Sequence, residues 1–144
     1  MLKIAIYSGS IPSTTFIENL IEGVSTKYEV LLFGKLLSKP SYTSKNIQYI
    51  SIYSNKFKTL IVTKWRTILL LLRYPKRFKI LWDELKQYKG LYHKFQWWSR
   101  YVPVLLSLPD IFHIQWAKDV DKWYFLKDKL GCKLVLSLRG AHIN

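Results

Sequence analysis

Residues 3–35, KIAIYSGSIPSTTFIENLIEGVSTKYEVLLFGK, decide the predicted fold. The run at 3–8 is apolar, rich in Ile and Tyr, and ends at Gly9, which is typical of a buried strand. A loop of small residues follows, and Thr15 with Glu18 fits the capping box of a helix start. Residues 28–33 form a second apolar run. This alternation of strand, loop, helix and strand predicts a parallel sheet with helical crossovers.

The last third of the chain returns to the same alternation. Residues 110–116 (DIFHIQW) read as a strand, 119–130 as a helix that stops at Gly131, and 132–138 as a near-continuous apolar strand. Residues 47–53 add a more polar strand, which suits a place near a sheet edge. We therefore expect one α/β domain, since 144 residues match the usual length of about 100–200 for a single domain.

The middle of the chain has a different composition. Residues 53–102 hold 12 of the 23 basic residues but only 2 of the 9 acidic ones, and 12 of the 23 aromatic residues. Apolar spacing predicts helices at 56–73, stopped by Pro75, and at 78–88, whereas 93–101 is ambiguous and limited by Pro103. The segment 54–102 is thus interpreted as a basic, aromatic helical insert.

A basic, aromatic surface attracts polyanions, and two interpretations of it stay open. The insert is either ordinary core with a solvated cationic face, or a helix pair lying on an anionic membrane. Nucleic acid is disfavoured because no recognised binding motif accompanies the charge. The candidate membrane-binding residues are Lys56, Lys64, Trp65, Arg66, Arg73, Lys76 and Arg77.

Several classes of site are disfavoured by the sequence. A single cysteine, Cys132, rules out an internal disulfide and a multi-cysteine metal site. We predict no metal site and no cofactor, and spacing alone assigns no catalytic residue. No signal peptide is visible, and the most apolar stretch, residues 67–72, is far shorter than the ~20 residues of a membrane span.

Ligands of open α/β sheets bind beyond the carboxyl ends of the strands, which singles out the loop 8–15, the loop 115–119 and residues 139–144. The loop around Gly9 and Ser10 either contacts phosphate or sugar or is a plain turn, because the pattern GxGxxG is absent. His113 is either a satisfied core imidazole or a cleft residue. Arg139 and Gly140 follow an apolar strand and either enter the cleft or form a solvated strand end.

Both ends of the chain resemble family 4 glycosyltransferases with the GT-B fold. The opening strand, Pro- and Ser/Thr-containing loop and "TFI" helix start resemble the first βαβ unit of that family. The closing stretch, PDIFHIQWA…LKDKLGCKLVLSLRGAHIN, resembles its later strands, with the patterns PD-x-x-H-x-x-W and S-x-R-G-x-x-I-N. Together the two stretches cover about half of the chain, and the middle insert matches no family pattern.

The resemblance implies a Rossmann-like parallel sheet with flanking helices, the N-terminal, acceptor-side half of a GT-B enzyme. Such an enzyme transfers a sugar with retention from a nucleotide-sugar to a saccharide or lipid-linked acceptor, here in exopolysaccharide or lipopolysaccharide biosynthesis. The resemblance assigns substrate contact to Gly9, Ser10, His113, Arg139 and Gly140. Arg139 stands where many relatives have His, and the first loop lacks their double Gly.

The same resemblance carries expectations about partners and location. No donor domain is recognised in the chain, so we expect a truncated or split enzyme, inactive alone, with a separate donor-domain chain as a candidate partner. We expect it in the cytoplasm, free or attached to the inner face of the cytoplasmic membrane. Two alternatives remain: a non-enzymatic, basic membrane-binding α/β module, and a flavodoxin-like nucleotide binder.

Overall fold

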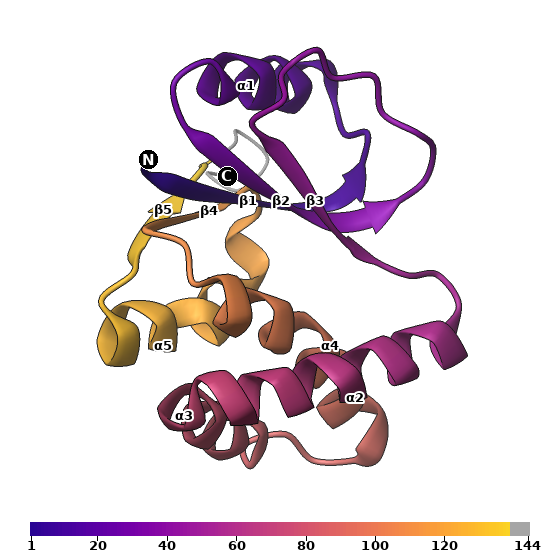
Figure 1. Ribbon diagram of the computed structural model, residues 1–144, viewed down its shortest axis with the longest axis vertical. Helices are drawn as coiled ribbons and strands as arrows, with labels where there is room; N and C mark the ends of the chain where they lie inside the picture. The colour runs from indigo at the N-terminus through magenta and orange to yellow at the C-terminus, as the bar shows by residue number, and fades with distance from the viewer. Residues whose placement is uncertain (139–144) are drawn as a thin grey trace. The chain divides into compact units, whose positions relative to one another are not determined.

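The computed structural model describes residues 1–138, apart from the side chains of residues 51 and 52. The chain divides into two compact units (Figure 1). The first contains Met1–Ser51 and the chain from Pro109 onward, and the second runs from Ile52 to Leu108. The predicted insert at 54–102 therefore falls inside the second unit.

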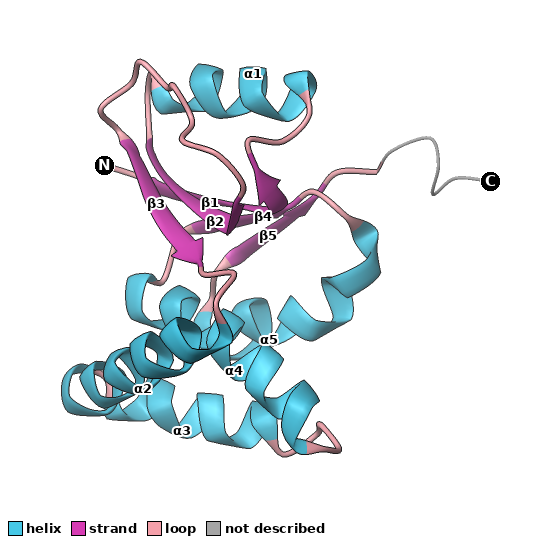
Figure 2. Cartoon of the chain, turned by 90° about the vertical axis from the view of Figure 1, so that its right-hand side faces the viewer, coloured by secondary structure: helices cyan, strands magenta, loops and turns pink. Residues whose placement is uncertain are grey.

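The first unit is a five-stranded parallel sheet with helices on both faces, which confirms the predicted Rossmann-like α/β class (Figure 2). Its elements are β1 (Lys3–Ile11), α1 (Thr15–Ser25), β2 (Glu29–Leu36), β3 (Ile47–Ile52), β4 (Ile111–Ile114), a 3₁₀ turn (Ala117–Asp119), α5 (Val120–Leu130) and β5 (Lys133–Leu136). The strand order is β3-β2-β1-β4-β5. This is the order of dinucleotide-binding Rossmann sheets, whereas flavodoxin-like sheets have the order 2-1-3-4-5, so the topology does not support the flavodoxin-like alternative.

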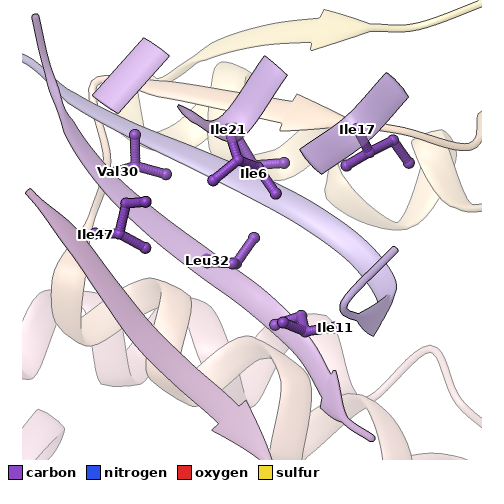
Figure 3. Close-up of a cluster of buried hydrophobic side chains, with 7 residues drawn as sticks. All are labelled: Ile6, Ile11, Ile17, Ile21, Val30, Leu32 and Ile47. Carbon is purple, nitrogen blue, oxygen red and sulfur yellow. The ribbon is translucent and has the colours of Figure 1, made fainter. Parts of the chain in front are cut away.

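Helix α1 covers one face of the sheet through aliphatic side chains (Figure 3). Ile17 and Ile21 lie one helical turn apart, and both are fully buried against β1 and β2. On β2, Val30 and Leu32 are two residues apart and face the same side of the sheet, as its pleat requires. The cluster consists of Ile6, Ile11, Ile17, Ile21, Val30, Leu32 and Ile47.

The opposite face of the sheet is packed with aromatic rings. Helix α5 lies on this face, across the sheet from α1 (Figures 1 and 2). Its Trp123 is fully buried, and the ring lies 4.6 Å from that of Phe112 on β4 and 5.1 Å from that of Tyr7 on β1. Gly131 ends α5 in the left-handed conformation, with φ of 69°, as the sequence predicts.

The carboxyl half of β1 contains a bulge. Tyr7 pairs with Phe33 but Ser10 pairs with Lys35, so β1 has one more residue than β2 across this interval. The bulge brings the Ser8 carbonyl against Gly34, where an added Cβ would lie 2.6 Å from that oxygen. Gly9 is different, because an added Cβ there would meet open space.

This contrast predicts effects of very different size for two glycine substitutions. Gly34→Ala should destabilise the protein by about 1–3 kcal/mol, because the new methyl group meets backbone and the strands must shift. Gly9→Ala should change the free energy of unfolding by less than about 0.5 kcal/mol. Urea unfolding followed by circular dichroism measures both, and equal effects would contradict the bulge geometry.

The second unit consists of three helices, α2 (Lys56–Arg73), α3 (Pro75–Leu85) and α4 (Leu91–Ser107). Asn55 caps α2 by accepting hydrogen bonds from the backbone amides of Phe57 and Lys58. Pro75 stops α2 as predicted, and it also begins α3 at the first helical position, three residues before the predicted start. The stacked rings of Tyr88 and Trp97 lie 5.7 Å apart, and the Tyr88 and Tyr101 hydroxyls share a hydrogen bond.

Two local predictions were wrong. Pro103 does not limit the third helix, since α4 continues to Ser107 and buries residues 101–105; packing outweighs the lost amide donor. The capping box at Thr15 is also displaced. Thr14 is the N-cap and makes no side-chain cap bond, and Glu18 instead accepts from the backbone amide of Ser13 at 2.6 Å. Among residues 1–138, no helix is both long and apolar enough to cross a membrane.

Candidate functional site

The strand order places a switch point at β1, which lies between β2 and β4. Parallel sheets of this kind bind ligands at such a point, outside the carboxyl ends of the strands. Tyr7 pairs with Ile114, and the Gln115 amide donates to the Tyr7 carbonyl at 3.3 Å. Gly9 and Ser10 therefore lie at the same edge of the sheet as the end of β4. The sheet brings together three of the sequence-predicted residues, Gly9, Ser10 and His113.

The loop from β1 into α1 carries a carboxylate where the sequence suggested an anion site. Glu18 accepts the Ser13 amide, one of the donors that a phosphate would need. Ser8 is buried and its hydroxyl donates to the Ser10 carbonyl at 3.0 Å, so it is also engaged. The negative charge of Glu18 disfavours a phosphate here and leaves uncharged, hydroxyl-bearing ligands as the better fit.

A pocket of about 270 Å³ opens beside this loop. Its wall includes the carboxylates of Glu18 and Glu22 and the ring of Tyr42, which stacks on Tyr49 with centroids 5.8 Å apart. Burial, followed by the neighbouring Glu18 carboxylate, raises the pKa of the Tyr42 phenol. Tyr42 therefore stays a neutral hydroxyl. The pocket lining offers two carboxylates, an aromatic wall and one cation, Lys39.

His113 lies on β4 with both neighbouring strands in register, opposite Ile6 of β1 and Val135 of β5. Its Nε2 lies 2.8 Å from the Ser137 hydroxyl, and Gln115 Nε2 lies 3.5 Å from its Nδ1. An amide N–H can only donate, so Nδ1 is the acceptor and the ring proton belongs on Nε2, facing Ser137. Both ring nitrogens thus have partners within the protein, and His113 is held in place by the ends of β4 and β5.

Burial lowers the pKa of His113 from its ordinary value of 6.5. The unfolded chain therefore binds this proton more readily than the folded protein does, so the neutral ring contributes stability above about pH 6.5 that is lost as the pH falls below it. Thermal unfolding should show a lower midpoint at pH 5.5 than at pH 7.5. His113→Asn should reduce that difference, and an unchanged difference would show that other groups cause it.

Two of the predicted site residues, Arg139 and Gly140, lie outside the described residues. Burial raises the pKa of the Cys132 thiol to about 11, so this cysteine is a packed thiol rather than a nucleophile. Within the described part of the chain, no three His, Cys, Asp or Glu side chains gather as metal ligands would.

The second unit presents an apolar stripe on α2. Phe57, Ile61, Trp65, Ile68 and Leu72 follow helical spacing, and each is between 50% and 74% exposed. The face of α2 that is buried consists of Thr59, Thr63 and Leu70 instead. The predicted apolar spacing is therefore real, but it marks a surface and not the interior of the helix bundle.

The seven candidate membrane residues fall into two groups. Lys56, Lys64, Trp65, Arg73 and Lys76 are exposed on α2 and the start of α3. Arg66 is partly buried, and that burial lowers its pKa. Arg77 donates to the Leu105 carbonyl at 3.0 Å and stacks on Tyr74, so its guanidinium ties α3 to the last turn of α4. The first group is the one available to an outside partner.

Gln115, the first residue of the candidate loop 115–119, lies beside His113 in the structure. Sequence reasoning missed three other residues near the candidate site. Ser137 holds His113 and is a polar residue directly after a strand, a signal that was present in the sequence. Glu22 and Tyr42 belong to the pocket beside the first loop. The loop 37–46 gives no local signal of where Tyr42 folds back.

Comparisons of the chain with protein-family models, with curated proteins and with solved structures found no match. The functional conclusion therefore depends on the residues and their arrangement.

Proposed function

We propose that the first unit is the acceptor-binding domain of a retaining, family 4-type glycosyltransferase of bacterial surface polysaccharide synthesis. The acceptor, a saccharide or lipid-linked sugar, binds at the carboxyl edge of β1 and β4. The nucleotide-sugar is held by a donor domain, as the GT-B resemblance implies, and a separate donor-domain chain is a candidate partner. Gly9, Ser10 and His113 line the acceptor side, together with Arg139 and Gly140 beyond the described residues.

One observation carries this proposal: the two stretches that resemble the family are 70 or more residues apart in sequence, yet β1 and β4 pair directly. Their carboxyl ends share the switch-point edge of the sheet, where a Rossmann-like domain binds its ligand. A chance resemblance of two separate segments does not require such pairing.

The balance of charges in the pocket beside the first loop favours a saccharide over a nucleotide. The lining of the pocket beside the first loop contains two carboxylates, Glu18 and Glu22, one cation, Lys39, and a neutral Tyr42. Carboxylates accept hydrogen bonds from sugar hydroxyls, whereas they repel the diphosphate of a nucleotide-sugar. Gly9 is exposed and an added Cβ there would meet open space, which leaves room for a bulky acceptor.

Membrane attachment belongs to the same proposal and is assigned to the second unit. The exposed stripe of α2 offers apolar side chains, and Lys56, Lys64, Arg73 and Lys76 offer cations for anionic lipid heads. Attachment would hold the acceptor site near lipid-linked sugars. The same stripe also favours the alternative, a non-enzymatic membrane-binding module.

Ligand binding by the purified chain separates these two functions. Isothermal titration with lipid-linked or free oligosaccharides of bacterial surface polysaccharides should detect binding that Gly9→Leu removes. Gly23→Leu is the matched control, because Gly23 is also exposed and an added Cβ there also meets open space. Membrane binding without any saccharide binding would favour the non-enzymatic module.

A further inference from the structure

The second unit contains a groove of about 650 Å³ between α2, α3 and α4. This volume is within the range of about 300–1,000 Å³ that is usual for small-molecule sites. Apolar side chains form most of its wall: Phe78, Leu81, Trp82, Leu85, Leu91 and Phe95. Trp82 and Leu91 are 61% and 88% exposed, so large apolar surfaces face solvent at this site.

The polar atoms of the groove floor are already bonded within the protein. The Thr67 hydroxyl donates to the Thr63 carbonyl at 2.7 Å and accepts from the indole N–H of Trp98 at 2.9 Å. Neither side chain therefore needs a polar atom of a ligand. The part of a ligand that lies on this floor is expected to be hydrocarbon.

The remaining two lining residues are the cations Lys86 and Lys94. Lys86 reaches Asp83 at 2.9 Å in an exposed ion pair, which is weak and readily exchanged. Among residues 1–138, no carboxylate lines the groove. A ligand with a hydrocarbon chain and an anionic head therefore matches the groove, because the chain fits its apolar side chains and the head fits Lys86 and Lys94.

We propose that this groove binds one acyl chain of an anionic membrane lipid, with the lipid phosphate near Lys86 and Lys94. A second copy of this chain is a poor occupant, because each copy has a net charge of +14 and the segment 53–102 alone holds 12 of its cations. The inference rests on the proposed membrane attachment only for the source of the lipid. It gives the second unit a site for a single lipid molecule, in addition to the proposed adsorption to a bilayer through the α2 stripe.

The test uses a monoacyl lipid below its critical micelle concentration, so that no bilayer is present. Lysophosphatidylglycerol should bind the full chain with one site by isothermal titration, and lysophosphatidylcholine of equal chain length should bind at least about fivefold more weakly. Trp82→Ala should weaken lysophosphatidylglycerol binding by about tenfold, as loss of a central aromatic contact does. Lys94→Glu should remove the preference for the anionic head.

Trp65→Ala is the matched control. Trp65 is 62% exposed, almost the same as Trp82, but it lies on the α2 stripe and does not line the groove. Equal losses in the two variants, or no binding of the monoacyl lipid by the folded protein, would overturn the proposal. Self-association that Trp82→Ala abolishes would instead assign the groove to a second copy and would also overturn it.

Vesicle binding distinguishes this failure from failure of membrane attachment. If the groove proposal alone is wrong, the protein binds anionic vesicles but not the monoacyl lipid. If attachment alone is wrong, the monoacyl lipid binds and Trp82→Ala weakens it, although vesicles are not bound. Circular dichroism of each variant confirms that the helices are retained.

Discussion

The double variant Phe57→Ser, Trp65→Ser is expected to lose at least about 100-fold in affinity for vesicles that contain anionic phospholipid. Both side chains are more than 60% exposed on the α2 stripe. Burying a large apolar side chain contributes about 1.5–3 kcal/mol, so losing two removes about 3 kcal/mol or more, and each 1.4 kcal/mol is tenfold in affinity. Co-sedimentation with vesicles measures the change.

The control replaces two similarly exposed aromatic residues on the first unit. Phe16 on α1 is 68% exposed, against 69% for Phe57, and Tyr124 on α5 is 56% exposed. Phe16→Ser, Tyr124→Ser should leave vesicle binding within about twofold of the original. If this control loses as much as the α2 variant, binding is not a property of the α2 stripe.

Trp123→Ala is expected to have the largest effect on stability, a loss of about 3–5 kcal/mol. The indole is fully buried, and its ring contacts Phe112 at 4.6 Å and Tyr7 at 5.1 Å. Truncation leaves a cavity between α5 and the sheet, because the aromatic neighbours cannot collapse into it fully. Denaturant unfolding followed by far-ultraviolet circular dichroism gives the free energy.

Tyr124→Ala provides the comparison within the same helix. Tyr124 is the neighbouring residue on α5 but faces solvent, so its replacement should cost less than about 1 kcal/mol. A similar cost for both variants would mean that Trp123 does not hold α5 on the sheet.

The sequence predicts the alternation of elements because that signal is local. The apolar runs that end at Gly9 and Gly34, and the stop at Gly131, are read from a few adjacent residues. Strand ends are harder, since β1 continues through Gly9 to Ile11 only because the bulge lets Ser10 and Ile11 pair with β2. That pairing depends on a strand more than 20 residues away.

Periodicity alone cannot say which face of a helix is covered. On α2 the apolar spacing of Phe57, Ile61 and Trp65 predicts a helix correctly, but these residues face solvent. The buried face uses Thr59 and Thr63. For the Thr59 hydroxyl, the acceptors are the Tyr53 and Asn55 carbonyls. A threonine satisfied in this way can pack inside, which hydropathy does not indicate.

The candidate site was only partly predictable for a related reason. Sequence position relative to strand ends indicated the loop around Gly9 and Ser10, because parallel strands share one functional edge. His113 was indicated by the PD-x-x-H-x-x-W pattern of the family resemblance. The carboxylates beside the first loop could not be found in this way. Glu18 reaches back to Ser13, and Tyr42 is brought in by a long loop, so their proximity is a property of tertiary packing.

The central claim is that a saccharide acceptor binds at the carboxyl edge of β1 and β4, and residue-resolved NMR tests it most directly. On titration with lipid-linked or free bacterial surface oligosaccharides, the amide signals of Gly9, Ser10, Gln115 and Ser137 should shift together with one dissociation constant. Gly9→Leu should abolish these shifts, and Gly23→Leu should leave them unchanged. Shifts confined to other surfaces, or none in the folded protein, would contradict the proposed site.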